Sequence, residues 1–176
     1  MTWTTYHRRG DVLRAVIETA DRRRDGVLPT DVPGVSETFA DADELLGALQ
    51  LKWHTRLAGR IEREQLSQPM DLRGAVVRAW RATADELPGI RAVIDAHRAE
   101  PGSERTALIM RKSTAKEQAL LAVSAGLASA QDRRAAAVGE RIEEEARAGW
   151  RPAPFAPRGS SESTSLLRRL RAALAA

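Results

Sequence analysis

The sequence predicts an all-α protein, an irregular helical bundle of about four core helices followed by a Pro/Ser-rich linker and a short C-terminal amphipathic helix. Apolar residues recur at helical spacing, and no run shows the period-2 alternation of a strand. Alanine, leucine, arginine and glutamate, all good helix formers, dominate the composition. With 43% hydrophobic and 30% charged residues, the 176-residue chain can bury the core of one domain. We expect a bundle domain over residues 1–149, a linker over 150–164 and the C-terminal helix over 165–176.

The first helix is expected over about residues 11–25. Gly26 supplies a natural C-terminal stop, while Trp3 and Tyr6 could extend the apolar face toward the N-terminus. Two closely spaced prolines within residues 27–35 forbid a regular helix there and predict an ordered loop. The apolar stripe of this helix consists of Val12, Leu13, Val16, Ile17 and Ala20.

The next three helices are bounded by caps and prolines. Asp41 and Glu44 have capping-box spacing at the start of the second helix, which Pro69 ends. The third begins at Asp71 and runs to about Leu87, and the Pro-Gly that follows separates it from a short fourth helix. Trp53 and Trp80 fall on apolar stripes and are expected in the core. The fourth helix carries Ile90, Val93, Ile94 and His97 on one side.

A fifth helix is capped by Ser103 and could reach Arg147. That length is unusual for a globular protein, so we expect a break near Gly126 or Gly139. The apolar, small-residue stretch at residues 119–130 is typical of a bundle centre. The highly charged stretch at residues 140–147 is expected to be solvated.

The predicted C-terminal helix carries the basic excess of the chain. Residues 151–176 hold five arginines and one glutamate, a net charge of +4 that equals the net charge of the whole chain. The remainder is therefore neutral, unlike most nucleic-acid-binding domains. A tethered leucine-and-arginine helix is typical of an element that docks on a protein partner or a second copy. The alternatives are that it folds back on its own bundle or touches an anionic surface. The candidate partner-binding residues are Leu166, Leu167, Arg168, Arg169, Leu170, Arg171 and Leu174.

Several functional classes find no support in the sequence. The absence of cysteine excludes disulfides, thiolate metal sites and thiol catalysis. There is no phosphate-binding loop, dinucleotide fingerprint or nucleophile elbow, and we predict no cofactor and no catalytic residue. With neither a signal peptide nor a run long enough to span a membrane, the chain is expected to be cytoplasmic and of bacterial type.

Three histidines, His7, His54 and His97, are the candidate metal ligands. Imidazoles converging in a bundle can hold a metal, with carboxylates completing the shell. However, no Glu-x-x-His or His-Glu-x-x-His spacing occurs, so ordinary core-edge or surface histidines are the favoured interpretation. Among the carboxylates, Glu117 follows Lys116 just before the apolar stretch, where one of the two residues is expected to be partly buried and paired.

One stretch resembles in outline the N-terminal part of the TetR-type regulators. It comprises Gly34 to Ser36, then Thr38 and Phe39, then residues 43–46, and the resemblance implies a DNA-binding regulator. Pro29 and Pro33 fall where the first helix of the helix-turn-helix should lie, and the spacing is several residues too short. No site residue is carried over from this family.

Together these observations predict a non-enzymatic helical protein that acts through protein–protein interaction or self-association. The first alternative is a metal- or small-ligand-binding bundle, which could be an enzyme, built around His54. The second alternative is a DNA-binding regulator.

Overall fold

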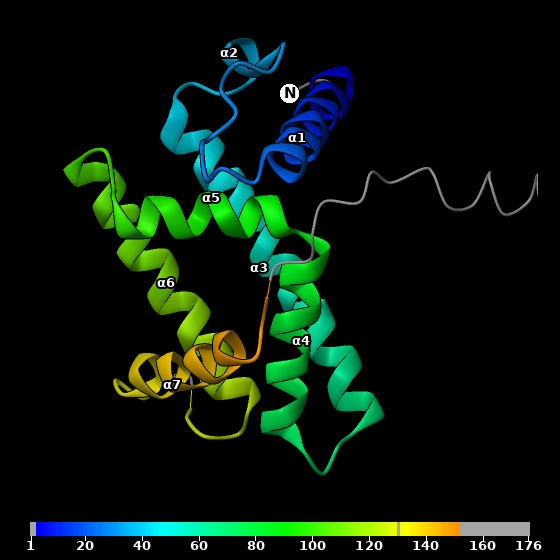
Figure 1. The fold of residues 1–176 in the computed structure, drawn as a ribbon, viewed down its shortest axis with the longest axis vertical. Coiled ribbons are helices and arrows are strands. Elements are labelled where there is room, and N and C mark those ends of the chain that lie inside the picture. The colour runs from blue at the N-terminus through cyan, green and yellow to red at the C-terminus, as the bar shows by residue number, and fades with distance from the viewer. Residues whose placement is uncertain (1–2, 130, 152–176) are drawn as a thin grey trace, which may run out of the picture.

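The computed structural model describes residues 3–129 and 131–151, and the predicted all-α class is confirmed (Figure 1). The predicted C-terminal helix and all but the first two residues of the predicted linker lie outside the described residues. The helices of the described part are α1 (Trp3–Arg23), α2 (Val35–Thr38), α3 (Ala42–Ser67), α4 (Leu72–Glu86), α5 (Pro88–Ala99), α6 (Glu104–Ser124) and α7 (Ala135–Ala148).

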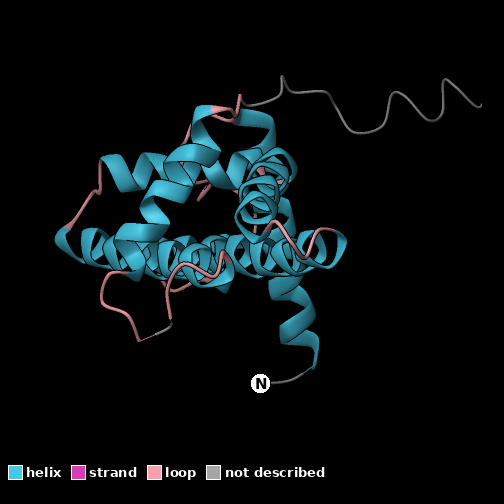
Figure 2. Ribbon diagram, turned by 90° about the horizontal axis from the view of Figure 1, so that it is seen from below, coloured by secondary structure: helices cyan, strands magenta, loops and turns pink. Residues whose placement is uncertain are grey.

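Helix α1 starts at Trp3, as the early apolar residues allowed, and packs mainly against α5. The contact is close because Gly89 has no side chain, and a Cβ there would overlap the backbone of Ala20. The Gly89 amide also donates to Asp21 Oδ1 at 2.9 Å. The C-terminal part of α1 is therefore fixed on the bundle, whereas its first turns stand clear of the other helices (Figure 2).

Helix α3 begins where the capping pattern predicted. Asp41 Oδ1 accepts from the Glu44 amide at 2.8 Å, and Glu44 Oε2 accepts from the Ala40 amide at 2.7 Å. Asp41 thus satisfies an amide of the first turn, and Glu44 satisfies the amide of the residue just before the N-cap. The stripe that this helix buries consists of Leu45, Leu46, Leu49, Trp53, Leu57 and Ile61.

Helices α4 and α5 are separated by the predicted Pro-Gly. Asp71 caps α4 by accepting from the Gly74 amide at 2.9 Å, and Pro88 occupies the first turn of α5, where its missing N–H costs nothing. Figure 1 shows α5 crossing the middle of the bundle. Because α1 packs on one side of α5, and α3, α4 and α6 pack elsewhere on it, both Ile90 and Arg91 are buried.

The predicted break in the fifth helix occurs at the first of its two glycines. Helix α6 ends at Ser124, and Gly126 adopts a positive φ of 70° that favours glycine. Gly139 instead lies inside α7, where a Cβ would overlap the backbone of Gln118. Glycine is therefore required there for the close approach of α7 to α6.

Two expectations about exposure in this region need correction. The stretch at residues 119–130 was expected at the bundle centre. Leu121, Ala122 and Ala125 are buried, but Val123 and Leu127 are exposed because α6 ends at Ser124. The stretch at residues 140–147 is not uniformly solvated, since Glu143 is only 3% exposed. Helix α7 lies against α6, whose Gln118 contacts Glu143, and Arg98 of α5 reaches the same carboxylate.

Within the described residues, no helix is both long enough and apolar enough to cross a membrane.

Candidate functional site

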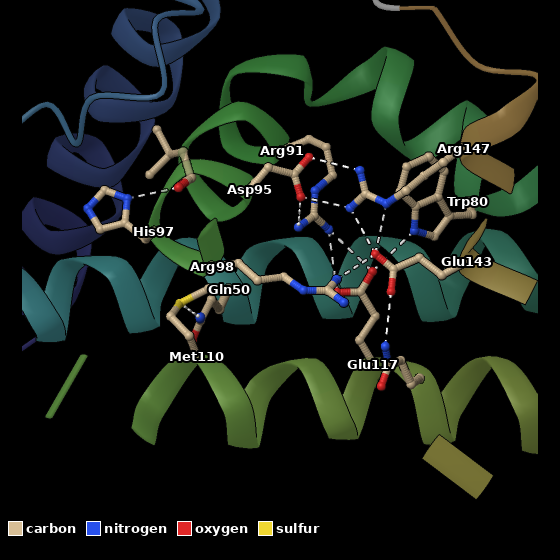
Figure 3. A network of polar contacts seen from close by, with 12 residues as sticks. Gln50, Trp80, Arg91, Asp95, His97, Arg98, Met110, Glu117, Glu143 and Arg147 are labelled. Carbon is tan, nitrogen blue, oxygen red and sulfur yellow. Dashed lines mark hydrogen bonds and ion pairs between the residues drawn. The ribbon is translucent and has the colours of Figure 1, made fainter. Parts of the chain in front are cut away.

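A cluster of charged side chains lies between α5, α6 and α7 and is lined by tryptophans of α3 and α4 (Figure 3). It contains three carboxylates and three guanidinium groups, which balance in charge. The charged residues of α5 are spaced i, i+4 and i+7, and the charged residues of α7 are spaced i and i+4. Each set therefore occupies one face of its helix. The charge cluster consists of Arg91, Asp95 and Arg98 of α5, Glu117 of α6, and Glu143 and Arg147 of α7.

The most buried ion pair of the cluster joins Arg91 and Glu117. Their side chains lie in the core, with residue exposures of 1% and 5%. Arg91 Nη1 lies 3.3 Å from Glu117 Oε1 and 3.4 Å from Oε2, and Arg91 Nη2 donates to Asp95 Oδ1 at 2.8 Å. The expectation that either Lys116 or Glu117 is buried and paired is resolved in favour of Glu117, while Lys116 is exposed.

Arg147 joins the remaining carboxylates. It donates to Asp95 at 2.7 and 3.0 Å and to Glu143 Oε1 at 2.8 and 2.9 Å. The same Glu143 oxygen accepts from Arg98 at 2.8 Å, and its second oxygen lies 3.3 Å from Gln118 Nε2. Every carboxylate of the cluster therefore contacts at least one guanidinium group.

Three tryptophan rings pack beside the charged side chains. Arg91 lies over the Trp53 ring with its Cζ 4.7 Å from the centroid, and Arg147 lies over the Trp80 ring at 4.9 Å. Trp80 meets Trp53 and Trp150 edge to face, at centroid distances of 5.9 and 5.7 Å. The sequence placed Trp150 at the start of the linker, but in the structure its ring packs on the bundle.

The charges around Glu117 keep it ionised. Burial is the largest single influence and would raise the pKa of this carboxyl. The charge of Arg91, together with His54 and Trp53, outweighs burial, and the pKa falls to about 2. Trp80 Nε1 also donates to Glu117 Oε1 at 3.2 Å. Trp53 Nε1 has no hydrogen-bond partner by distance and angle, although its N–H dipole is close enough to help lower the pKa of Glu117.

Arg147 is stabilised in its charged form by the same arrangement. Burial would lower the pKa of its guanidinium, but the hydrogen bond and charge of Asp95, with Glu143, outweigh burial and raise it. The cluster is thus a set of ions whose charges are already matched. A general acid or base needs a pKa near the working pH, and the pKa of Glu117 lies far below neutrality. The geometry favours a role in fixing how these helices pack.

The structure describes the side chains of two of the three candidate histidines. His54 Nε2 lies 3.8 Å from Glu117 Oε2 at the edge of the charge cluster. His97 lies to one side of it in Figure 3, with Nδ1 2.8 Å from the Val93 carbonyl oxygen. His7 belongs to α1, but its side chain is outside the described part. Among the described residues, no three His, Cys, Asp or Glu side chains are grouped so that they could hold a metal ion.

An open apolar groove lies on another face, between the N-terminal parts of α1 and α3. Its volume is about 630 Å³. The floor combines small residues with leucines, and Leu51 is 68% exposed. Arg9 bridges one end by donating to Glu44 Oε1 at 2.8 Å and to the Thr38 carbonyl oxygen at 3.0 Å. The lining residues are Arg9, Gly10 and Leu13 of α1 and Glu44, Gly47, Ala48, Leu51, Lys52 and Thr55 of α3.

Neither feature follows from the sequence alone. The i, i+4, i+7 charges of α5 are a visible signal, but on most helices such a pattern indicates a solvated face. The predicted partner-binding residues between Leu166 and Leu174 lie outside the described part of the chain. No protein-family model, curated protein or solved structure matches this chain.

Proposed function

We propose that this chain is a non-enzymatic helical interaction protein. Its two contact elements are the open groove between α1 and α3 and the C-terminal leucine-and-arginine segment. The proposal rests on one observation, the groove. It is an apolar surface on a bundle whose buried charges are paired with one another. Grooves of this kind accept the apolar face of an amphipathic helix.

The residue types of the groove support this use. Gly47 and Ala48 leave room for another backbone to approach, and Leu13 and Leu51 supply apolar contact on either side. The charge cluster supports it indirectly, because ion pairs that join α5, α6 and α7 favour one arrangement of these helices. A surface that keeps its shape loses less conformational entropy when a partner binds.

A selection experiment tests the proposal. Immobilised protein ending at Ala156 is offered a library of twelve-residue amphipathic helices, and bound peptides are measured by fluorescence anisotropy. We expect binders that are lost with L51E, because a charge in the groove must be desolvated. L127E is the matched control, since Leu127 is 50% exposed but lies after α6, away from the groove. If no peptide is enriched, or if L51E and L127E bind equally well, the proposal is wrong.

The metal-binding alternative keeps one specific observation in its favour, the proximity of His54 to the buried carboxylate of Glu117. Elemental analysis of untagged protein, with H54A as the control, decides it. A stoichiometric metal lost in H54A would replace the interaction proposal with this one. The DNA-binding alternative is tested by measuring duplex binding at low salt, where phosphate contacts are strongest.

A further inference from the structure

We propose that the groove between α1 and α3 is occupied in the resting protein by the chain's own C-terminal segment, residues 165–176. The inference rests on the proposed function, because it assumes that the groove accepts an amphipathic helix. It names the segment that occupies the groove, and it implies that a partner helix must displace that segment.

The lengths of the two elements match. The α3 side of the groove extends from Glu44 to Thr55, which is twelve residues and roughly 18 Å of helix. The segment 165–176 also has twelve residues and as a helix would be roughly 18 Å long. One such helix can therefore lie along the full length of the groove.

The residue patterns are complementary. Leu166, Leu170 and Leu174 recur every four residues and form one stripe, with Leu167 beside it. In the groove, Gly47 and Ala48 provide space into which leucine side chains fit. The arginines of the segment lie off the leucine stripe and can stay in water.

The point at which the described chain ends puts the groove within reach. Trp150 packs on Trp80 at 5.7 Å, and Trp80 packs on Trp53 at 5.9 Å. Trp53 follows Lys52, a groove residue, on the same helix, and a helix is about 10 Å across. The linker at residues 152–164 has 13 residues and spans roughly 20 Å as a coil. Fully extended, it reaches roughly 43 Å. The line through these rings crosses the buried core, so the linker must run around the bundle, and its extended length is what allows docking within one molecule.

The charges at the rim predict how the contact responds to salt. Arg9 is paired with Glu44, and Lys52 is exposed, so the rim offers no excess of carboxylates to the arginines of the segment. The contact must depend on leucine burial and should change little between low and high salt. A segment that bound nucleic acid or an anionic membrane would instead be released by salt.

Hydrogen exchange on the full chain tests the proposal. Amide exchange at residues 10–13 and 44–55 is compared between the wild type and the tail variant L170E. We expect exchange there to be about tenfold slower in the wild type, because losing one buried leucine changes an equilibrium by about that factor. L51E should remove the same protection from the groove side. The matched controls are R169Q in the segment and L127E on the body, and both should behave as the wild type does.

Three results would overturn the proposal. One is equal exchange in the wild type and L170E. Another is protection at residues 66–72 and 123–127, which would place the segment on the exposed leucines there. The third is protection that increases with protein concentration together with a dimer in sedimentation, which would assign the segment to a second copy. The version ending at Ala156 could bind peptides while the groove amides of the full chain show no protection by residues 165–176. That combination would refute this inference but leave the proposed function intact. Tail protection without binding of any library peptide would refute only the proposed function.

Discussion

Replacing Glu117 by glutamine removes one buried charge and almost nothing else. Glutamine has the same shape and keeps an oxygen that can accept from Trp80 Nε1, whereas Arg91, at 1% exposure, loses its most buried counter-charge. Breaking a buried ion pair from one side is costly because the remaining charge stays desolvated. The variant E117Q therefore isolates the contribution of ionised Glu117 to stability.

The pKa of Glu117 sets the size of the effect. It falls from an ordinary value of 4.5 to about 2 in the folded protein. A depression of that size corresponds to about 3 kcal/mol of stability. Because the folded-state pKa is the lower one, this stability is fully present above pH 4.5 and is lost as the pH falls toward 2. We expect E117Q to be about 3 kcal/mol less stable than the wild type at pH 7 and about half as much at pH 3.

Urea unfolding followed by circular dichroism measures this difference at pH 7, 5, 4 and 3. The matched control is E145Q, which removes a half-exposed carboxylate paired with Arg73. Exposed pairs of this kind contribute at most about 1 kcal/mol, and the control should show no comparable pH dependence. A difference in stability between E117Q and the wild type that stays constant from pH 7 to pH 3 would contradict this prediction. It would mean that the ionisation of Glu117 does not stabilise the fold.

Three further predictions concern substitutions within α3, α5, α6 and α7. R91M should destabilise the protein by about 3–5 kcal/mol in urea unfolding, and the double variant R91M/E117M should recover most of that loss, since a buried pair can be replaced by apolar side chains. G139A should lower stability by about 3 kcal/mol because its Cβ would overlap the Gln118 backbone, and an unchanged melting temperature would contradict the packing of α7 on α6. G59A should raise stability by up to about 1 kcal/mol, because no atom lies within 4 Å of the new methyl group.

The sequence predicted where α3, α4 and α6 begin, although α1 begins about eight residues earlier than its expected start and α2 was not predicted. These boundaries depend on neighbouring residues, such as the side chains of Asp41, Asp71 and Ser103, each of which accepts from an amide of the first turn that follows it. The break near Gly126 was predictable for the same reason, because a positive φ is a property of one residue. The apolar stripes likewise predicted that Trp53 and Trp80 belong to the core, where both are fully buried.

The open groove was not predictable from the sequence, because it arises from how far apart two helices lie. Helix α1 is held against α5 at Gly89 and bridged to α3 by Arg9, and between these points it does not cover Gly47, Ala48 and Leu51. A helical stripe indicates which face is apolar, but it does not indicate how much of that face a neighbour covers.

Which charges are buried depends on how the helices pack. The charged residues of α5 and α7 have the local pattern of a solvated face, and residues 140–147 were wrongly expected to be solvated for that reason. Arg98 supplies the counter-charge of buried Glu143 from 45 positions away, and Asp95 meets Arg147 across 52 positions. Burying an ion is tolerable only when another element supplies its counter-charge. Local residue patterns therefore specify the helices and their apolar faces, while the packing of the helices produces the charge cluster and the groove.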